Sequence, residues 1–380
     1  MKKKRILIVA SYSGSLIHFR GDFIKSLINH DFAVYTAAPN YSVEITQQLL
    51  NIGAKPIEFK LERTGLNPLN DLKSISELRY IIKTSKIDLV FPYTVKPVIF
   101  SSLAANQCKV PVISLITGLG FAFTGITFKA RILQRLNEFL YKQSIRKNKV
   151  IIFQNKDDYA LFLDRKIISK KNKVCFVSGS GVDLNKYKVR INNNTSNVIS
   201  FLLVARLIEE KGIQLYIEAA ELLKQKYPDV EFHVIGEPDQ SPSAIKLEKL
   251  NDLNNKNIIV YHGKQANIPE HLFKRDVFVL PTYYREGIPR SILEALSVGL
   301  PIITTESPGC KETVIKGKNG ILIPPRNLEQ LVCAMEFFII HKEKIKEMGI
   351  NSRKYAEERF DVNIINEDLL NIINSNLQLL

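Results

Sequence analysis

Arg206 and Lys211 are two cations five residues apart that follow an apolar run at residues 198–204 and precede Gly212. The apolar run predicts a strand, so both cations would lie just beyond a strand end. Arginine can hold phosphate through its forked donors, and lysine acts on phosphate as a point charge. This element is therefore a candidate phosphate clamp, although the same residues often only solvate the start of a helix.

A second element, residues 281–296, follows another apolar run and carries two carboxylates, Glu286 and Glu294. Its loop leads into a helix predicted to begin near Pro289, because proline suits the first helical turn. The backbone amides and the dipole at that helix start favour an anion. Carboxylates beside an anion site are expected where a sugar also binds, since they accept hydrogen bonds from hydroxyl groups. The alternatives are two solvated surface acids, or a glycosidase pair, which leaves the phosphate elements unexplained.

Short apolar runs alternate with amphipathic stretches along the chain, which predicts an α/β protein with parallel sheets covered on both faces. A polar stretch at residues 192–197 divides this alternation, so we expect a domain at residues 1–190, a second at 191–360 and a helical tail at 361–380. Ligands of doubly wound domains bind beyond the carboxyl ends of the strands, so a shared ligand would lie between the two domains. The predicted strands are residues 5–10, 33–37, 89–91, 112–115, 150–153, 174–177, 198–204, 231–235, 258–261, 277–280, 301–304 and 320–323; predicted helices include 19–29, 71–84 and 128–147.

Positive charge is concentrated in the first half of the chain. The net charge is +15, and residues 1–183 hold 28 Lys and Arg against 13 Asp and Glu, whereas residues 184–380 hold 25 of each. This asymmetry predicts an anionic partner for the first domain, either phospholipid or nucleic acid. No nucleic-acid-binding motif accompanies the charge, so we expect an anionic membrane surface and no nucleic acid. Lysine used only for solubility is the alternative.

Targeting and metal signals are weak in this sequence. Four cysteines stand alone, without spacing for zinc or a disulfide framework, which is typical of a reducing compartment. The apolar run after Arg5 is too short for a signal peptide. The uncharged residues 110–128 contain three glycines and indicate a buried strand with a glycine-rich loop. We expect a cytoplasmic protein that does not span the membrane.

Residues 129–149 form a basic amphipathic stretch with apolar residues at helical spacing. Such a helix can lie on an anionic membrane. The alternative is that its apolar face packs on the sheet of its own domain while the cations are solvated, and both can hold together. The cations are Lys129, Arg131, Arg135, Lys142, Arg146, Lys147 and Lys149, against Glu138 alone; the apolar residues are Ile132, Leu133, Leu136, Phe139, Leu140 and Ile145.

The paired motifs together resemble the retaining GT-B enzymes of glycosyltransferase family 4, in which two Rossmann-like domains face each other across a cleft. The resemblance is carried by Glu286-x7-Glu294, with Gly287 and Pro289 inside it and Arg206-x4-Lys211-Gly212 before it, and by Gly181-Val182-Asp183, residues 299–303 and residues 309–312. Three further segments resemble a subgroup that acts on polyprenyl-diphosphate-linked sugars in bacterial surface polysaccharide and glycan assembly. They are Ser13-Gly14, His18-Phe19-Arg20 and Thr117-Gly118-Leu119-Gly120.

The resemblance implies a UDP-sugar donor and a role for each element. Arg206 and Lys211 would neutralise the donor diphosphate as it leaves, and Glu286 would contact the transferred sugar. Glu294 would hold the ribose hydroxyls. Other donor contacts would come from Gly14, from the stretch Gly263 to Ile268 beside the base, and from Gly287, Ile288, Pro289, Arg290, Ser291 and Ile292 around the diphosphate. Neither a metal ion nor another cofactor is implied.

The chain departs from the family at one place. Many members carry a histidine in the first domain that touches the transferred sugar, and Thr117 occupies that region here. His18, Arg20 and Thr117 are therefore candidates for contacts to the acceptor or the sugar. The resemblance implies transfer of a hexose or N-acetylhexosamine to a polyprenyl-diphosphate-linked sugar, by an enzyme held peripherally at the inner face of the cell membrane. A UDP-sugar epimerase on the same scaffold is the alternative.

Overall fold

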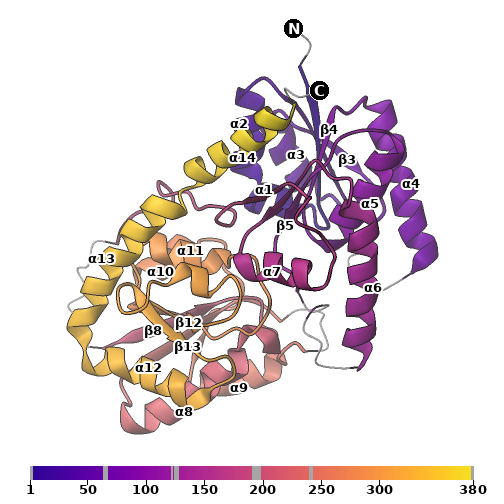
Figure 1. The fold of residues 1–380 in the computed structure, drawn as a ribbon. Coiled ribbons are helices and arrows are strands. Elements are labelled where there is room, and N and C mark those ends of the chain that lie inside the picture. Colours follow the sequence, from indigo (N-terminus) through magenta and orange to yellow (C-terminus); the bar gives the residue numbers. More distant parts are fainter. Residues whose placement is uncertain are drawn as a thin grey trace. The chain divides into compact units, whose positions relative to one another are not determined.

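A computed structural model describes residues 3–62, 67–120, 123, 128–190, 198–238 and 243–377. The chain forms two compact units (Figure 1). Unit 1 comprises Met1–Ser180 and Asn363–Leu380, and unit 2 comprises Gly181–Val362. The division therefore falls ten residues before the expected boundary at 190, and nearly all of the expected tail at 361–380 is part of unit 1.

The strands of unit 1 are parallel and follow the order β3-β2-β1-β4 and β5-β6-β7. Isolated parallel bridges, Val90 to Val112 and Tyr93 to Leu115, join β4 to β5. The sequence order reverses between β1 and β4, as in a doubly wound fold. The strands are β1 (Arg5–Val9), β2 (Ala33–Ala38), β3 (Lys55–Glu58), β4 (Leu89–Pro92), β5 (Ile113–Ile116), β6 (Val150–Phe153) and β7 (Val174–Phe176).

Helices cover both faces of this sheet because its strands are apolar on both sides. Leu7 and Val9 belong to one buried cluster, with α4, α5, α6 and α7. Ile6 and Ile8 belong to the other, with α2, α3 and α14. The helices are α1 (Gly14–His18), α2 (Gly21–Asn29), α3 (Val43–Ile52), α4 (Pro68–Thr84), α5 (Val95–Gln107), α6 (Phe128–Ile145), α7 (Lys156–Asp164) and α14 (Val362–Leu377).

Unit 2 repeats this architecture with the parallel strand order β10-β9-β8-β11-β12-β13. Here the order reverses between β8 and β11. The strands are β8 (Ser200–Val204), β9 (Glu231–Ile235), β10 (Val260–Tyr261), β11 (Val277–Leu280), β12 (Ile302–Thr305) and β13 (Gly320–Ile323). The helices are α8 (Ile213–Lys226), α9 (Leu247–Asn255), α10 (Ile268–Phe273), α11 (Arg290–Ser297), α12 (Leu328–Ile340) and α13 (Lys342–Arg359), with short 3-10 helices η2 (Glu209–Lys211) and η3 (Lys311–Thr313).

The segment just after Gly181 packs into unit 2, which explains the early boundary. Val182 forms a parallel bridge with Asp361, and its amide donates to the Phe360 carbonyl over 2.8 Å. Gly181 has φ +71, and a Cβ there would lie 2.6 Å from the Cα of Val362. Tyr187, only 3% exposed, is buried in the same apolar cluster as α11. These contacts bind the segment to unit 2 before the polar stretch begins.

Membrane-spanning helices need both length and apolar character. Within the residues that the structure describes, no helix combines the two to the extent needed to cross a bilayer.

Candidate active site

Two loops of unit 2 leave the sheet side by side where its strand order reverses. One follows β8 and carries Arg206 and Lys211, and the other follows β11 and carries Glu286. Hydrogen bonds tie the loops together, because the Glu210 carbonyl accepts from the Tyr283 amide (3.0 Å) and from the Thr282 hydroxyl (2.8 Å). Such a reversal point at the carboxyl ends of the strands is where doubly wound sheets bind ligands.

Gly212 shows how closely these loops approach each other. Its φ is +78, and a Cβ at this position would lie 2.2 Å from the Pro281 carbonyl oxygen. A side chain would therefore collide with backbone that cannot move without breaking β11. The glycine after Lys211 is required by the packing of the two loops and by its left-handed conformation.

Lys211 and Glu286 form an ion pair at this point. The Lys211 Nζ lies 2.5 Å from a carboxylate oxygen of Glu286, and the two side chains are 11% and 15% exposed. The same ammonium lies 5.7 Å from the centroid of the Tyr284 ring. Arg206 lies on the same loop and is exposed. The structure thus brings together two of the predicted site residues, Lys211 and Glu286, while Arg206, five residues before Lys211, lies at the surface.

The loop after β12 packs against the backbone of the loop that carries Glu286. Gly309 has φ +80, and a Cβ there would lie 1.7 Å from the Gly287 carbonyl oxygen. The Thr305 hydroxyl donates to the Thr282 carbonyl over 2.5 Å. Burial, followed by the nearby Glu286 carboxylate, raises the pKa of the Cys310 thiol to about 12, so this thiol stays neutral. The site-bearing loop is therefore held on two sides by neighbouring strand ends.

Helix α11 begins where the Glu286 loop ends. Pro289 precedes it in an extended conformation, with φ −65 and ψ 119. The apolar side of the helix fixes its orientation, since Ile292 and Leu293 are fully buried. The Ile292 amide donates to the Pro289 carbonyl over 3.1 Å, and the positive end of the helix dipole lies at this turn. The helix start near Ser291 thus has the electrostatic character expected of a diphosphate site.

Glu294 is held in place by two side chains. The Arg290 Nε lies 3.1 Å from its carboxylate oxygen, and Glu294 is 12% exposed. The Tyr187 hydroxyl also hydrogen-bonds to Glu294; burial first and then this carboxylate raise the pKa of Tyr187, so the tyrosine remains a donor. Sequence reasoning missed Tyr187, because nothing in the pattern links it to a helix so far along the chain.

Tyr187 should affect donor binding through Glu294. A Tyr187→Phe variant is expected to bind UDP about two- to tenfold more weakly, the effect of one net hydrogen bond, as measured by calorimetry. Tyr227→Phe is the matched control, because the Tyr227 hydroxyl also donates to a carboxylate, Glu336, over 2.9 Å. Equal UDP affinity in both variants and the natural protein would contradict a role for Tyr187 in positioning Glu294.

The stretch Gly263 to Ile268 follows β10 and leads into α10. Gly263 has φ +64, and a Cβ at this position would meet no other atom within 4 Å, so only the backbone conformation favours glycine. Its carbonyl accepts from the Gly236 amide over 2.9 Å. Ile268 is half-buried and packs against the apolar cluster of α11. Both ends of the predicted base-contacting stretch are thus fixed to the sheet and its helices.

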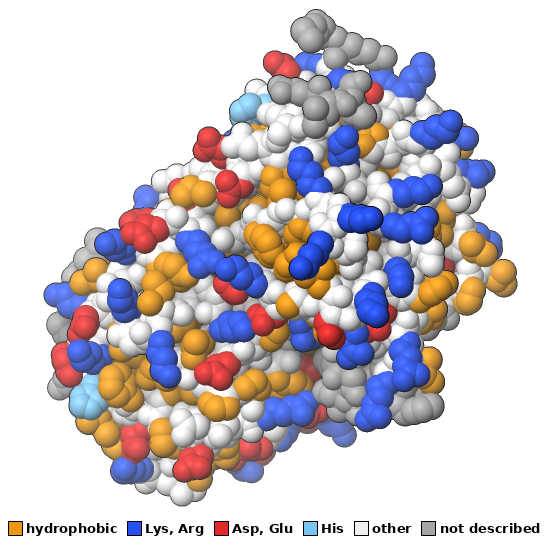
Figure 2. Space-filling view, in the orientation of Figure 1, with side chains coloured by type: hydrophobic (Ala, Val, Ile, Leu, Met, Phe, Trp, Pro, Cys, Tyr) orange, Lys and Arg blue, Asp and Glu red, His pale blue; other side chains and the backbone are white. Residues whose placement is uncertain are grey.

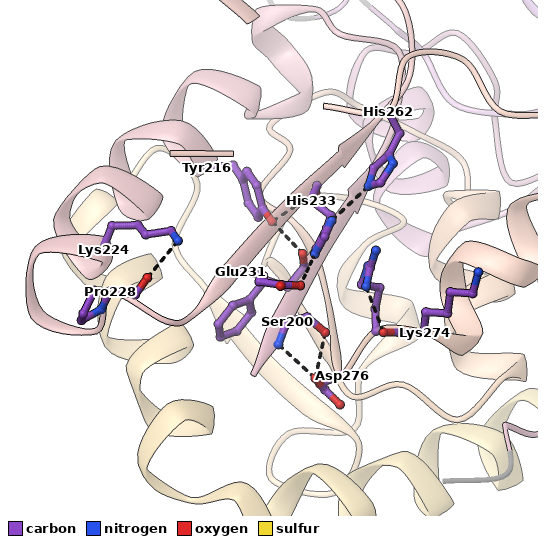
Figure 3. A network of polar contacts seen from close by, with 11 residues as sticks. Ser200, Tyr216, Lys224, Pro228, Glu231, His233, His262, Lys274 and Asp276 are labelled. Carbon is purple, nitrogen blue, oxygen red and sulfur yellow. Dashed lines mark hydrogen bonds and ion pairs between the residues drawn. The ribbon is translucent and has the colours of Figure 1, made fainter. Parts of the chain in front are cut away.

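A chain of polar contacts lies at the start of this stretch (Figure 3). The His233 Nδ1 lies 3.0 Å from the His262 Nε2, and the His233 Nε2 lies 2.9 Å from a Glu231 oxygen. Burial and Arg275 lower the pKa of His233 to about 4. Burial, followed by His271, lowers the pKa of His262 to about 4. Both rings are therefore neutral near pH 7, and one can donate to the other, which steadies the end of β10.

In unit 1, the loop after β1 carries Gly14 at the start of α1. A Cβ on Gly14 would lie 2.7 Å from the ring of Tyr12, an exposed side chain. The Tyr12 ring therefore covers Gly14 in this structure. Nearby, the Thr94 hydroxyl donates to Ser11 over 3.1 Å, and Thr94 has φ +68, an unfavourable conformation for a β-branched residue. Nothing in the sequence pattern predicted this backbone conformation at Thr94.

The other three candidates of unit 1 occupy different environments. His18 is exposed in the last turn of α1. Thr117 is half-buried directly after β5. Arg20 is only 2% exposed, and its guanidinium lies 5.3 Å from the centroid of the Tyr93 ring. Arg20 therefore lies below the surface in this structure, whereas His18 lies at the surface and Thr117 is partly covered.

A protein metal site would need several ligating side chains close together. Across the described part of the chain, no group of three or more His, Cys, Asp or Glu side chains is placed to hold a metal ion.

Two doubly wound α/β units are the architecture of GT-B glycosyltransferases, and solved structures share it. HepE from Anabaena in complex with UDP aligns with a TM-score of 0.76 and 19% identity, over 98% of this chain and 100% of that chain. A glycosyltransferase from Rickettsia africae aligns with a TM-score of 0.78 and 19% identity, over 99% of each chain. The predicted fold class, α/β with the GT-B fold, is confirmed.

Sequence comparisons then identify the family. Residues 5–155 match the family described as Glycosyl transferase 4-like, and residues 185–355 match Glycosyl transferases group 1. The chain is 30% identical to the N,N'-diacetylbacillosaminyl-diphospho-undecaprenol alpha-1,3-N-acetylgalactosaminyltransferase of Campylobacter jejuni, over 97% of this chain and 98% of that protein. It is 29% identical to the UDP-Gal:alpha-D-GlcNAc-diphosphoundecaprenol alpha-1,3-galactosyltransferase of Escherichia coli, over 71% of each. The chain therefore belongs to the group 1, family 4-like glycosyltransferases. Both relatives are transferases, so the epimerase alternative gains no support.

Proposed function

We propose that this glycosyltransferase moves a hexose or N-acetylhexosamine from a UDP-sugar to a sugar carried on polyprenyl diphosphate, with retention of configuration, in surface polysaccharide or glycan assembly. The observation that carries the proposal is the Lys211–Glu286 ion pair, on loops that leave the sheet at its reversal point beside the start of α11. A cation, a carboxylate and a helix start together suit a sugar joined to a diphosphate. The printed names of both curated relatives, with their diphosphoundecaprenol-linked substrates, support this class of acceptor.

The chemistry asked of these residues is stabilisation of a leaving group. When the bond between the sugar C1 and the donor diphosphate breaks, negative charge grows on the diphosphate; the acceptor hydroxyl oxygen forms the new bond to C1, and its proton passes to the departing diphosphate. Lys211, Arg206 and the first turn of α11 would stabilise that charge, which is electrostatic catalysis. Glu286 would accept hydrogen bonds from the transferred sugar, and Glu294 from the ribose. The stretch from Gly263 would lie against the uracil.

The acceptor and the membrane are assigned to unit 1. A lipid-linked acceptor stays in the bilayer, so an enzyme that uses it gains from being held at the membrane surface. The excess of cations in residues 1–183 suits the anionic inner face of a cell membrane. We therefore assign the protein a peripheral position on the cytoplasmic face, with His18 and Thr117 as the first candidates for acceptor or sugar contacts.

A substrate screen tests the proposed function. UDP- and GDP-sugars, beginning with UDP-N-acetylgalactosamine and UDP-galactose, are offered with a short-chain polyprenyl-diphosphate sugar, and products are read by mass. A product heavier by one sugar, with the anomeric configuration of the donor, is expected from a UDP-sugar. Conversion of the donor sugar to its epimer without any change in the acceptor would overturn the transferase assignment.

Activity is expected to survive chelation of divalent ions. In the proposed mechanism Lys211, Arg206 and the start of α11 would supply the positive charge that a metal ion would otherwise supply to the departing diphosphate. The measurement is the initial rate with EDTA in excess, beside a metal-dependent glycosyltransferase in the same buffer, which should stop. An absolute requirement for Mg²⁺ or Mn²⁺ would count against this mechanism.

A further inference from the structure

Helix α6 has apolar side chains on two opposite sides. On its inner side, Tyr141 and Ile145 are buried in the core of unit 1. On its outer side, Ile132, Leu136 and Phe139 are 52%, 37% and 57% exposed. Their spacing of four and then three residues places these three side chains in one stripe along the helix. The packing of the inner side thus leaves a second apolar surface, the α6 stripe, open to solvent.

Cations border the α6 stripe. Arg131, Arg135 and Lys142 are exposed, and their spacing of four and seven residues places them in a row beside it. Arg146 and Lys147 follow the end of the helix and are exposed too. Glu138 is the single acid of the helix; it is half-buried and accepts from Gln134 over 2.8 Å. The border of the stripe is therefore strongly positive.

The face around α6 continues this character. Blue Lys and Arg side chains, with orange apolar ones between them, are frequent over the α4 and α6 region in Figure 2. On α4, which packs with α6 against the same buried cluster, Leu69 and Leu72 are 72% and 63% exposed. Apolar groups set among cations are the composition of helices that lie in the interface of anionic membranes.

Charge also argues against a second copy of this chain as the occupant. A two-fold dimer formed through the α6 stripe would bring the row of Arg131, Arg135 and Lys142 close to the same row of its partner. Like charges facing each other across an interface oppose association. An anionic bilayer avoids this cost, because phosphate groups would meet the cations while the acyl region receives the apolar side chains.

We propose that α6 docks unit 1 on an anionic membrane by inserting Ile132, Leu136 and Phe139 into the interface, with Arg131, Arg135 and Lys142 at the level of the headgroups. The inference deepens the proposed peripheral function, on which it rests, by naming the surface and by adding insertion to charge attraction. Each cation at the headgroups strengthens binding about fivefold at low salt. The apolar contribution should remain when salt screens the charges.

Fluorescence gives a direct test of insertion, because the chain contains no tryptophan. A Phe139→Trp variant is mixed with vesicles of phosphatidylcholine, with or without phosphatidylglycerol, and no polyprenyl lipid. A blue shift of the tryptophan emission is expected with vesicles that contain phosphatidylglycerol, and no shift is expected with vesicles of phosphatidylcholine only. Ile350→Trp is the matched control, since Ile350 is 62% exposed on α13 of unit 2. Equal emission of Phe139→Trp with and without anionic vesicles would overturn the proposal.

Sedimentation with the same vesicles separates charge from insertion. Changing Arg131, Arg135, Lys142 and Arg146 to Glu is expected to weaken binding at low salt more than about a hundredfold, as four cations at about fivefold each require. Changing Ile132, Leu136 and Phe139 to Ser should abolish the binding that remains at high salt. Serine at Leu222, Ile340 and Ile350, exposed apolar residues of unit 2, should change nothing.

The remaining outcomes identify other occupants. Binding only to vesicles that contain a polyprenyl-diphosphate sugar would make the stripe an acceptor site and overturn bilayer docking. If the natural protein self-associates and does not bind vesicles, and the serine variant does not self-associate, the α6 stripe is a dimer interface. Activity on a soluble short-chain acceptor should be equal in the serine variant and the natural protein. Absence of transferase activity from both proteins, with vesicle binding by the natural protein intact and lost in the serine variant, would remove the proposed function and leave the docking surface standing.

Discussion

A Lys211→Ala variant is expected to turn over the donor about 10²–10³ times more slowly than the natural protein. That is the effect of removing one group aimed at charge that develops in a transition state. The Lys211 side chain is 11% exposed, and its ammonium lies beside Glu286 on the loop between β11 and α11, so water can replace it only poorly. The first measurement is kcat with saturating UDP-sugar and acceptor. The second is the affinity for UDP by calorimetry, and we expect this affinity to fall by a smaller factor than kcat.

The control for this variant must separate catalysis from the loss of an ion pair. Removing Lys211 takes an ion-pair partner from the poorly exposed Glu286 carboxylate, which is itself destabilising. Lys226→Ala removes another lysine–carboxylate pair of unit 2, with Glu336 at 2.6 Å, where the lysine is 65% exposed. It should leave kcat unchanged. A kcat for folded Lys211→Ala close to that of Lys226→Ala would exclude Lys211 from leaving-group stabilisation.

Arg206 extends the same prediction to the second cation. It is exposed on the loop after β8, whereas Lys211 is mostly buried between the two loops. Its replacement by alanine should lower kcat strongly with little effect on stability, because surface positions seldom carry folding energy. Replacement by lysine should recover part of the rate, since lysine keeps the charge but loses the forked geometry. If the natural protein, Arg206→Ala and Arg206→Lys have equal kcat values, Arg206 has no part in the mechanism and Lys211 is the one side-chain cation that remains in it.

The elements of unit 2 follow closely from the sequence because their signals are local. Strands β9, β11 and β13 have in the structure the bounds that the apolar runs at residues 231–235, 277–280 and 320–323 predict. The two chemically distinctive elements each follow a strand, and parallel strands end at the same edge of a sheet, so their proximity followed from the topology. The missed strand β3 (Lys55–Glu58) shows the limit of this signal, since it is an edge strand with no apolar run.

The remaining features depend on contacts between distant parts of the chain. Tyr187 reaches Glu294 because the segment after Gly181 packs against α11. Because of the same packing, the boundary between the two units follows Ser180 and does not lie at the expected residue 190. For α6, the sequence left open whether its apolar residues face the sheet or the solvent. In the structure some of these apolar residues are buried in unit 1 and others are exposed to solvent. Apolar residues lie on more than one side of the helix, and only one side packs against the rest of the unit.

Glu294 and Glu286 should separate donor binding from turnover. Glu294→Ala is expected to weaken the binding of UDP itself about tenfold to hundredfold, since a charged hydrogen bond to the ribose contributes roughly 1.5–3 kcal/mol. Glu286→Ala should leave UDP affinity nearly intact and lower kcat, because its proposed contact is with the transferred sugar, which UDP lacks. Calorimetry with UDP and steady-state kinetics with the full donor make the two measurements on the same proteins.

Glu336→Ala is the matched control for Glu294→Ala, because the two carboxylates have the same kinds of partner. Glu294 is held by Arg290 and Tyr187, and Glu336 by Lys226 and Tyr227. Glu336 lies on α12 beside the end of α8, a helix that begins just after Lys211 and ends at Lys226. Loss of UDP affinity in both variants would indicate general damage to unit 2. Unchanged UDP binding by Glu294→Ala would refute its contact with the ribose, and the donor's hydroxyl groups would then have to be held by other residues beside α11.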